Sequence, residues 1–149
     1  MTTPGAPDAS APFTPQARHL AVVSGGSGDP SQTRMLAERM AESASAALSE
    51  HGVVPQIHLI TLRELAVDIA QALVTFAISP ALRAALDEVA QADAVIAVSP
   101  TYKASYSGLF KSFWDLAEPT SVVGVPVLLG ATGGTARHSL MIDTAMRPL

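Results

Sequence analysis

The sequence predicts an open α/β sheet of mostly parallel strands, with helices on both faces in three layers. Three observations lead to this fold class. Short apolar runs alternate four times with longer segments of helical period. No long hairpin signal interrupts them, and parallel strands need a crossover that a helix supplies. Residues 94–98 are wholly apolar, as expected of a central strand covered on both faces. We therefore predict the strand order 2-1-3-4.

The first half of the chain is predicted to form a strand, a helix and a second strand. Residues 19–23 are an apolar run that ends at Ser-Gly-Gly. Apolar residues then recur at spacings of three and four up to Gly52, which is typical of an amphipathic helix. Its expected buried stripe is Met35, Leu36, Met40, Ala44, Ala47 and Leu48. Residues 53–60 alternate imperfectly, which favours an edge strand over a central one.

The second half begins with the segment whose secondary structure is hardest to predict. Residues 62–69 suggest a turn or two of helix, while residues 73–78 fit either helix or strand. Ser79 and Pro80 then provide an N-cap and a first-turn proline for a helix to about residue 92. Its expected stripe is Leu82, Leu86, Val89 and Ala90. After the central strand we expect a loop to residue 107, a helix at 108–116, a fourth strand at 125–129 and a helix from 138 to 146.

Composition limits the function classes. The chain has 149 residues, 48% of them hydrophobic, and a net charge of −4, which suits one globular domain. Its nine basic residues form no cluster, so we expect no nucleic-acid partner. It has no cysteine, which excludes disulfides and thiolate sites and fits a cytoplasmic protein. No apolar stretch is long enough to cross a membrane.

The N-terminal segment differs in composition from the rest. It is rich in proline and small residues and lacks the basic start and apolar core of a secretory signal. We therefore expect a flexible tail at 1–17 and one domain at 18–149.

Ligands of parallel α/β sheets bind outside the carboxyl ends of the strands. The loops at 24–34, 99–108 and 131–135 follow the first, third and fourth predicted strands. We expect these three loops to meet around one ligand.

The first loop is a candidate anion cradle. It combines several glycines with hydroxyls at Ser31 and Thr33, on either side of Gln32, at the start of a helix. It lacks the ending of a P-loop, and the second strand does not end in the acidic residue that holds a dinucleotide ribose. The phosphate of a mononucleotide fits better than ATP or NAD. The alternative, which this loop taken alone favours, is a tight turn with Asp29 or Ser31 as N-cap. Asp29 also argues against the anion site, because a carboxylate pointing into the cradle would repel a phosphate.

The other two loops suit a planar ring. The second places two of the chain's few aromatic residues in a polar segment just after the most apolar strand, and loops of this kind usually carry function. Its candidate residues are Pro100, Thr101, Tyr102, Lys103, Ala104, Ser105 and Tyr106. For Tyr106, packing against a neighbouring helix is an equal alternative. The third loop contributes Thr132, Gly133 and Gly134, either as a plain turn or as a backbone surface that a flat ring can approach closely.

Together these segments resemble the NAD(P)H-dependent FMN reductases of flavodoxin-like fold. The matching segments are strand one, residues 31–33, the motif at 99–108 followed by Lys111, and residues 131–138. The most similar group supplies reduced FMN to two-component monooxygenases of the alkanesulfonate and luciferase-like kind. The family continues with a fifth strand and a final helix, whereas this chain stops at Leu149. We therefore expect the fifth strand to be missing from this chain.

The resemblance implies a reaction and a set of contacts. NADPH or NADH would pass a hydride to FMN, whose phosphate would lie at residues 31–33. The isoalloxazine edge would lie against 100–106, with 132–134 near its other side. No side chain is assigned as a catalytic acid or base, because the cofactor carries the chemistry. The partners implied are a transiently bound flavin-dependent monooxygenase and copies of this chain, as a homodimer or homotetramer.

Several expectations accompany this reading. The alternatives are an FMN-bound quinone or azo reductase and a flavodoxin-type electron carrier, the latter disfavoured by the modest net charge of −4.

The sequence predicts no metal site, because its histidines, His19, His51, His58 and His138, show no ligand spacing. The helix at 108–116 has more apolar surface than one face can bury in a small domain, which predicts a subunit contact. Its apolar residues are Leu109, Phe110, Phe113, Trp114 and Leu116.

Overall fold

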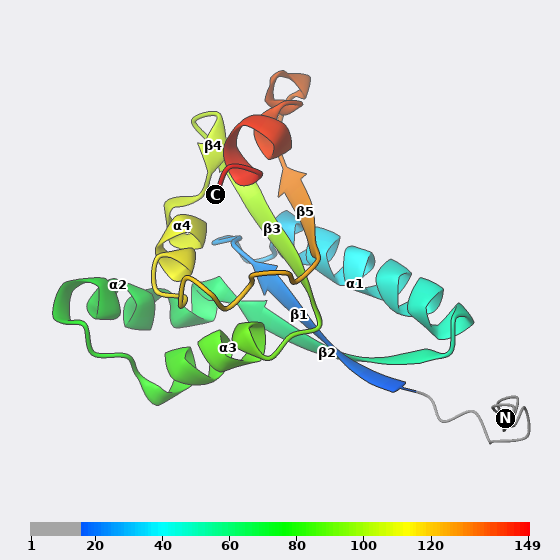
Figure 1. The fold of residues 1–149 in the computed structure, drawn as a ribbon. Helices are drawn as coiled ribbons and strands as arrows, with labels where there is room; N and C mark the ends of the chain where they lie inside the picture. The colour runs from blue at the N-terminus through cyan, green and yellow to red at the C-terminus, as the bar shows by residue number, and fades with distance from the viewer. Residues whose placement is uncertain (1–15) are drawn as a thin grey trace, which may run out of the picture.

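The computed structural model describes residues 16–149 and shows one twisted sheet between two layers of helices (Figure 1). The sheet contains β1 (Gln16–Ser24), β2 (Val53–Thr61), β3 (Ala94–Tyr102), β4 (Ser105–Tyr106) and β5 (Val127–Thr132). The parallel order is β2-β1-β3-β5, and the short β4 pairs antiparallel with β3. The predicted order 2-1-3-4 is confirmed, with β2 at an edge and β3 central. The expected tail lies outside the described residues, apart from its last two, which belong to β1.

Helices cover the two faces of the sheet unequally (Figure 1). One face is covered by α1 (Gln32–Glu50), and the other by α2 (Ala66–Thr75), α3 (Pro80–Ala90) and α4 (Gly108–Trp114). Alternate residues of β1 divide between the two cores: Leu20 and Val22 face α1, whereas Ala21 and Val23 face the other three helices. A strand has a side-chain period of two, so this central strand is buried on both sides.

The buried stripes of the helices depart from the predicted ones in part. In α1 the fully buried residues are Thr33, Ala37 and Ala41, while Met35 is 42% exposed. Small side chains occupy the line of closest approach to the sheet, so the larger residues that the periodicity singled out lie at its flanks. In α3 the Ser79 hydroxyl accepts a hydrogen bond from the Leu82 N–H, as the predicted cap requires.

The structure settles one segment that the sequence left open and corrects the predicted C-terminal helix. Residues 61–79 form the 3₁₀ turn η1 (Leu62–Leu65) followed directly by α2. Near the C-terminus, the predicted helix is replaced by η2 (Ala136–His138) and the π-helical turn η3 (Ile142–Met146). The wide turn suits burial, because Met141 and Met146, five residues apart, both reach the core.

The test for membrane spans finds no single helix of sufficient length and apolarity within residues 16–149. Leu62–Thr75 and Pro80–Ala90 pass it only as a pair, which is bent by 93°.

Asp93 ties the turn before β3 to β1. Its Oδ2 accepts a 2.8 Å hydrogen bond from the His19 N–H, and its Oδ1 lies 2.7 Å from the Arg18 guanidinium. The His19 N–H first, and the Arg18 guanidinium second, hold the pKa of Asp93 below its ordinary value of 3.8. The folded state therefore gains stability from this carboxylate above that value and loses it as pH falls through the lower folded pKa.

We expect Asp93→Asn to make the free energy of unfolding less dependent on pH at acid pH. The free energy of unfolding of the wild-type chain, measured with urea, should decrease as pH falls from about 4 toward 2. That of the variant should decrease less over the same interval. If the two profiles run parallel through this range, the Asp93 contacts do not persist in solution.

Candidate active site

The three predicted loops surround one cavity of about 340 Å³ at the carboxyl ends of β1, β3 and β5. Its lining comprises Gly26, Ser27, Gly28, Pro30, Ser31, Gln32, Thr33, Pro100, Thr101, Tyr102, Thr132, Gly133 and Gly134. Nine of these are among the thirteen candidate residues of the sequence analysis. The glycine-rich residues before Ser31 were missed as individual contacts, although their loop was identified.

The N-terminus of α1 opens onto this cavity. Ser31 is its N-cap, and the Ser31 hydroxyl accepts a 3.2 Å hydrogen bond from the Arg34 N–H. The helix itself offers no partner to the N–H groups of Gln32 and Thr33, since these belong to its first turn. That turn contains no acidic residue. The helix end therefore presents positive potential and free donors to an anion.

The charged side chains nearest this helix end, Asp29 and Arg34, each form an ion pair with another residue. The Asp29 carboxylate lies 2.9 Å from the Arg63 guanidinium, so it forms an exposed ion pair with η1. Arg34 is held by Glu38 at 2.8 Å. That hydrogen bond, and the Glu38 charge with it, raises the pKa of Arg34. The repulsion expected from Asp29 is thus offset by its own partner.

Gly26 is required by a close approach inside the first loop. A Cβ atom at this position would lie 2.3 Å from the Ser31 Oγ and 2.9 Å from the Thr33 Cβ. Any side chain here would displace the two hydroxyl residues of the loop. Glycine therefore allows the loop to fold back over the start of α1.

The second loop is a tight hairpin that the sequence analysis did not predict. Tyr102 pairs with Ser105 across a two-residue turn, in which Lys103 has φ 51° and Ala104 has φ 65°. Positive φ at both central residues is the condition of a type I′ turn, which usually contains Asn-Gly. Neither residue here is one of those, so the hairpin signal was absent from the sequence.

The hairpin divides the predicted ring contacts into two groups. Pro100, Thr101 and Tyr102 line the cavity, whereas the residues from Lys103 to Tyr106 are not part of its lining. The Tyr106 ring lies 6.0 Å from the Phe110 ring, centroid to centroid. The alternative in which Tyr106 packs against a neighbouring helix matches this arrangement.

Side-chain hydrogen bonds join the three loops to one another. The Ser27 hydroxyl lies 3.2 Å from the Tyr102 hydroxyl, which links the first loop to the second. The hydroxyls of Thr33 and Thr132 lie 2.8 Å apart, which links α1 to the third loop. Thr33 is 3% exposed, and this bond is partly buried. The cavity wall is therefore held together across segments far apart in the sequence.

Two buried serines support this wall from behind. The Ser107 hydroxyl donates to the Gly25 carbonyl at 3.0 Å and accepts from the Phe110 N–H as the cap of α4. The Ser99 hydroxyl accepts from the Ser107 N–H at 2.9 Å. The sequence offered one signal for the first of them, a serine directly before a predicted helix. Lys111, which closes the middle motif, is paired with Asp115, and this hydrogen bond raises the pKa of Lys111.

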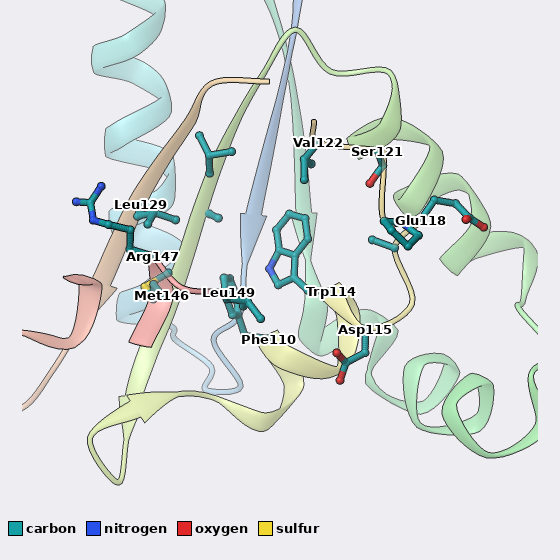
Figure 2. Close-up of a pocket in the computed structure, with 14 residues that line it drawn as sticks. Phe110, Trp114, Asp115, Glu118, Ser121, Val122, Leu129, Met146, Arg147 and Leu149 are labelled. Carbon is teal, nitrogen blue, oxygen red and sulfur yellow. The ribbon is translucent and has the colours of Figure 1, made fainter. Parts of the chain in front are cut away.

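A second cavity of about 480 Å³ lies between α4, β5 and the C-terminal turn (Figure 2). Trp114, Val122 and Leu129 point into it, with Asp115, Glu118 and Arg147 also in its lining (Figure 2). It contains no glycine loop and no helix N-terminus, so it lacks the features of an anion site. Within α4, Phe110 and Phe113 are buried in the core of the chain itself, and the predicted subunit contact stays a prediction.

Comparisons with known proteins agree with this geometry. An NADH-dependent FMN reductase, SfnF, from Pseudomonas putida is 42% identical over 130 residues, which are 87% of this chain and 68% of that protein. An FMN reductase (NADPH) from Pseudomonas aeruginosa is 36% identical over 130 residues, 87% of this chain and 67% of that protein. The chain thus spans about two thirds of the length of these relatives.

Structural similarity supports the same assignment. The crystal structure of an oxidoreductase from Corynebacterium diphtheriae superimposes with a TM-score of 0.86 at 38% identity, covering 89% of this chain and 73% of that one. The flavodoxin-like fold is therefore confirmed. The sequence model of the NADPH-dependent FMN reductase family matches residues 19–149. The chain belongs to the NADPH-dependent FMN reductase family.

Proposed function

We propose that this protein catalyses the reduction of FMN by NAD(P)H and passes reduced FMN to a flavin-dependent monooxygenase. The observation that carries the proposal is the meeting of three loops around one cavity at the carboxyl ends of β1, β3 and β5. That is where the ligands of open α/β sheets bind. The names of the relatives, which are NADH- and NADPH-dependent FMN reductases, support both the flavin and the donor.

The cavity fits a flavin mononucleotide at both ends. At one end, the first turn of α1 offers N–H groups and the Ser31 hydroxyl to a phosphate. At the other end, a Cβ atom added to Gly134 would meet no atom within 4 Å, so this backbone is open to a flat ring. Thr101 also lines the cavity, and its Oγ1 is buried and has no hydrogen-bond partner among the described residues. A buried hydroxyl without a partner is expected to bind a ligand or a water.

The protein's part in the reaction is to position the flavin and to stabilise the charge of its reduced form. FMN, when bound, would supply the chemistry by accepting a hydride from the nicotinamide. The α1 N-terminus and Ser31 would hold the phosphate, which fixes where the ring lies. Backbone N–H groups near Thr101 and in the third loop would stabilise the negative charge of the reduced ring. The Ser27–Tyr102 hydrogen bond would keep the first two loops together around it.

The partners and location follow from this chemistry as further parts of the proposal. Reduced FMN reacts with oxygen, so a monooxygenase that uses it would take it up through a transient contact. We place the protein in the cytoplasm, where nicotinamide cofactors are available, as a homodimer or homotetramer. Both NADH and NADPH remain candidate donors, since the relatives include reductases named for each.

The test measures NADH and NADPH oxidation by the purified protein with and without added FMN. We expect oxidation that rises to saturation with FMN and is negligible without it. Riboflavin, which lacks the phosphate, should give a KM at least about tenfold higher, because it forfeits charge-assisted hydrogen bonds at α1. Quinone reduction at the same rate without added FMN would instead identify an FMN-bound quinone reductase. A chain that oxidises neither donor with FMN present would overturn the proposal.

A further inference from the structure

A cluster of three metal-ligating side chains lies away from the cavity. It consists of His19 on β1, His58 on β2 and Glu88 on α3, each half-buried. One ligand atom from each lies within 4.8 Å of the other two. His19 is five residues before the end of β1, so about 16 Å of strand separates it from the first loop.

Strand register brings the two histidines together. Ala21 of β1 pairs with His58 of β2, and His19 lies two residues before Ala21. Parallel partners share a face of the sheet, so both rings lie on the face covered by α3. The rings stack with centroids 5.5 Å apart and an angle of 7° between their planes. The two residues are far apart in the sequence, which is why their spacing carried no metal signal.

Glu88 completes the cluster from the helix above. Its Oε2 lies 3.0 Å from the His58 Nδ1. Two ligands of one tetrahedral zinc ion, with bonds of about 2.0–2.1 Å, are about 3.3 Å apart. The separation of this imidazole and this carboxylate is therefore already close to that of two ligands of the same ion.

One ring nitrogen of His58 has no hydrogen-bond partner in the described part of the chain. Its Nδ1 has Glu88 as a partner, but its Nε2 is buried and has none among residues 16–149. A buried imidazole nitrogen without a partner costs free energy until the ring turns or a water binds it.

We propose that His19, His58 and Glu88 bind a divalent transition-metal ion, Zn²⁺ foremost, with water completing its coordination. Two imidazoles and one carboxylate are a ligand set that zinc accepts, and imidazole also suits nickel and cobalt. A ligating lone pair lies in the plane of its ring, so two parallel rings cannot both face one ion. Binding therefore turns one ring about χ2, a soft torsion for histidine, and breaks the stack. The ion would join β1 and β2 to α3, so its effect is on stability.

Calorimetric titration of the chelator-treated protein with Zn²⁺ tests the site. We expect one ion per chain, and an affinity at least about tenfold lower in each of His19→Gln, His58→Gln and Glu88→Gln. His51→Gln and Asp87→Asn are the matched controls. The His51 Nδ1 lies 2.8 Å from the Ala47 carbonyl at the end of α1, and Asp87 is the acidic residue next to Glu88 on α3. Both controls should bind as the wild type does.

A second readout separates binding from misfolding. Zn²⁺ should raise the thermal midpoint of the wild-type chain and of both controls, but not that of the three ligand variants. Co²⁺ should give a visible absorption band of nitrogen and oxygen coordination that the His58→Gln variant lacks. The proposal is overturned if the wild-type chain takes up no Zn²⁺ at millimolar concentration. It is also overturned if folded ligand variants bind Zn²⁺ as tightly as the controls.

Discussion

Replacing Ser31 and Thr33 together by alanine is expected to lower FMN affinity by at least tenfold. The Ser31 hydroxyl stands at the N-terminus of α1 beside the proposed phosphate position, and the Thr33 hydroxyl holds Thr132 of the third loop. A hydrogen bond to a charged group contributes about 1.5–3 kcal/mol, and about 1.4 kcal/mol corresponds to a tenfold change in affinity. Turnover at saturating FMN should be largely kept, because neither side chain is proposed to contact the ring. Fluorescence titration of FMN measures the affinity.

The matched control is Ser79→Ala. Ser79 caps α3 with the same hydrogen bond that Ser31 makes to α1, its hydroxyl accepting the backbone N–H three residues later at 3.2 Å. Each change should cost about 1 kcal/mol of stability through the lost cap, but only the first-loop change should weaken FMN binding. Unchanged FMN affinity in the Ser31 and Thr33 double variant would mean that the first loop is only a helix cap.

Gly134→Ala should lower FMN affinity about tenfold or more without destabilising the fold. A Cβ atom at this position meets no other atom within 4 Å, and the backbone φ is not in the left-handed region. The added methyl group therefore costs the protein little. It would, however, occupy the space in which the proposed flavin ring packs against the glycine backbone, and a planar ring cannot retreat from one face without losing contacts on the other.

Gly108→Ala is the control for this experiment. Gly108 also has no neighbour within 4 Å for an added Cβ atom, but it begins α4 and does not line the cavity. Thermal midpoints of both variants should stay close to that of the wild type, and only Gly134→Ala should bind FMN more weakly. Equal FMN affinity in the two variants would place the ring away from the third loop.

Most of the sheet could be predicted because its signals are local. An apolar strand buried on both faces shows as a continuous run, as at residues 94–98, and a capped helix shows as Ser79-Pro80 before a regular stripe. The meeting of three loops follows from topology alone, since parallel strands end on the same side. The C-terminal π-helical turn was not predictable, because its width depends on Met141 and Met146 both reaching the core.

Within the candidate site, residue types were predictable but their partners were not. The sequence identified hydroxyls at Ser31 and Thr33, but it carried no sign that Thr33 would bond to Thr132. It marked both Tyr102 and Tyr106 as ring contacts and left helix packing as an equal alternative for Tyr106. The two-residue turn at Lys103 and Ala104 sets Tyr102 beside the cavity and Tyr106 against Phe110. A turn of positive φ without glycine leaves no compositional signature.

The sequence by itself determined the fold class, the order of the parallel strands and the three loops that would meet, because periodicity and strand ends are properties of short segments. Only the tertiary structure decided which side chains touch across those segments. His19 and His58 show the difference most clearly, since nothing near either residue predicts the other. Their stacking depends on the register of β1 against β2, and a shift of one residue in that register would turn one of the two rings to the opposite face of the sheet.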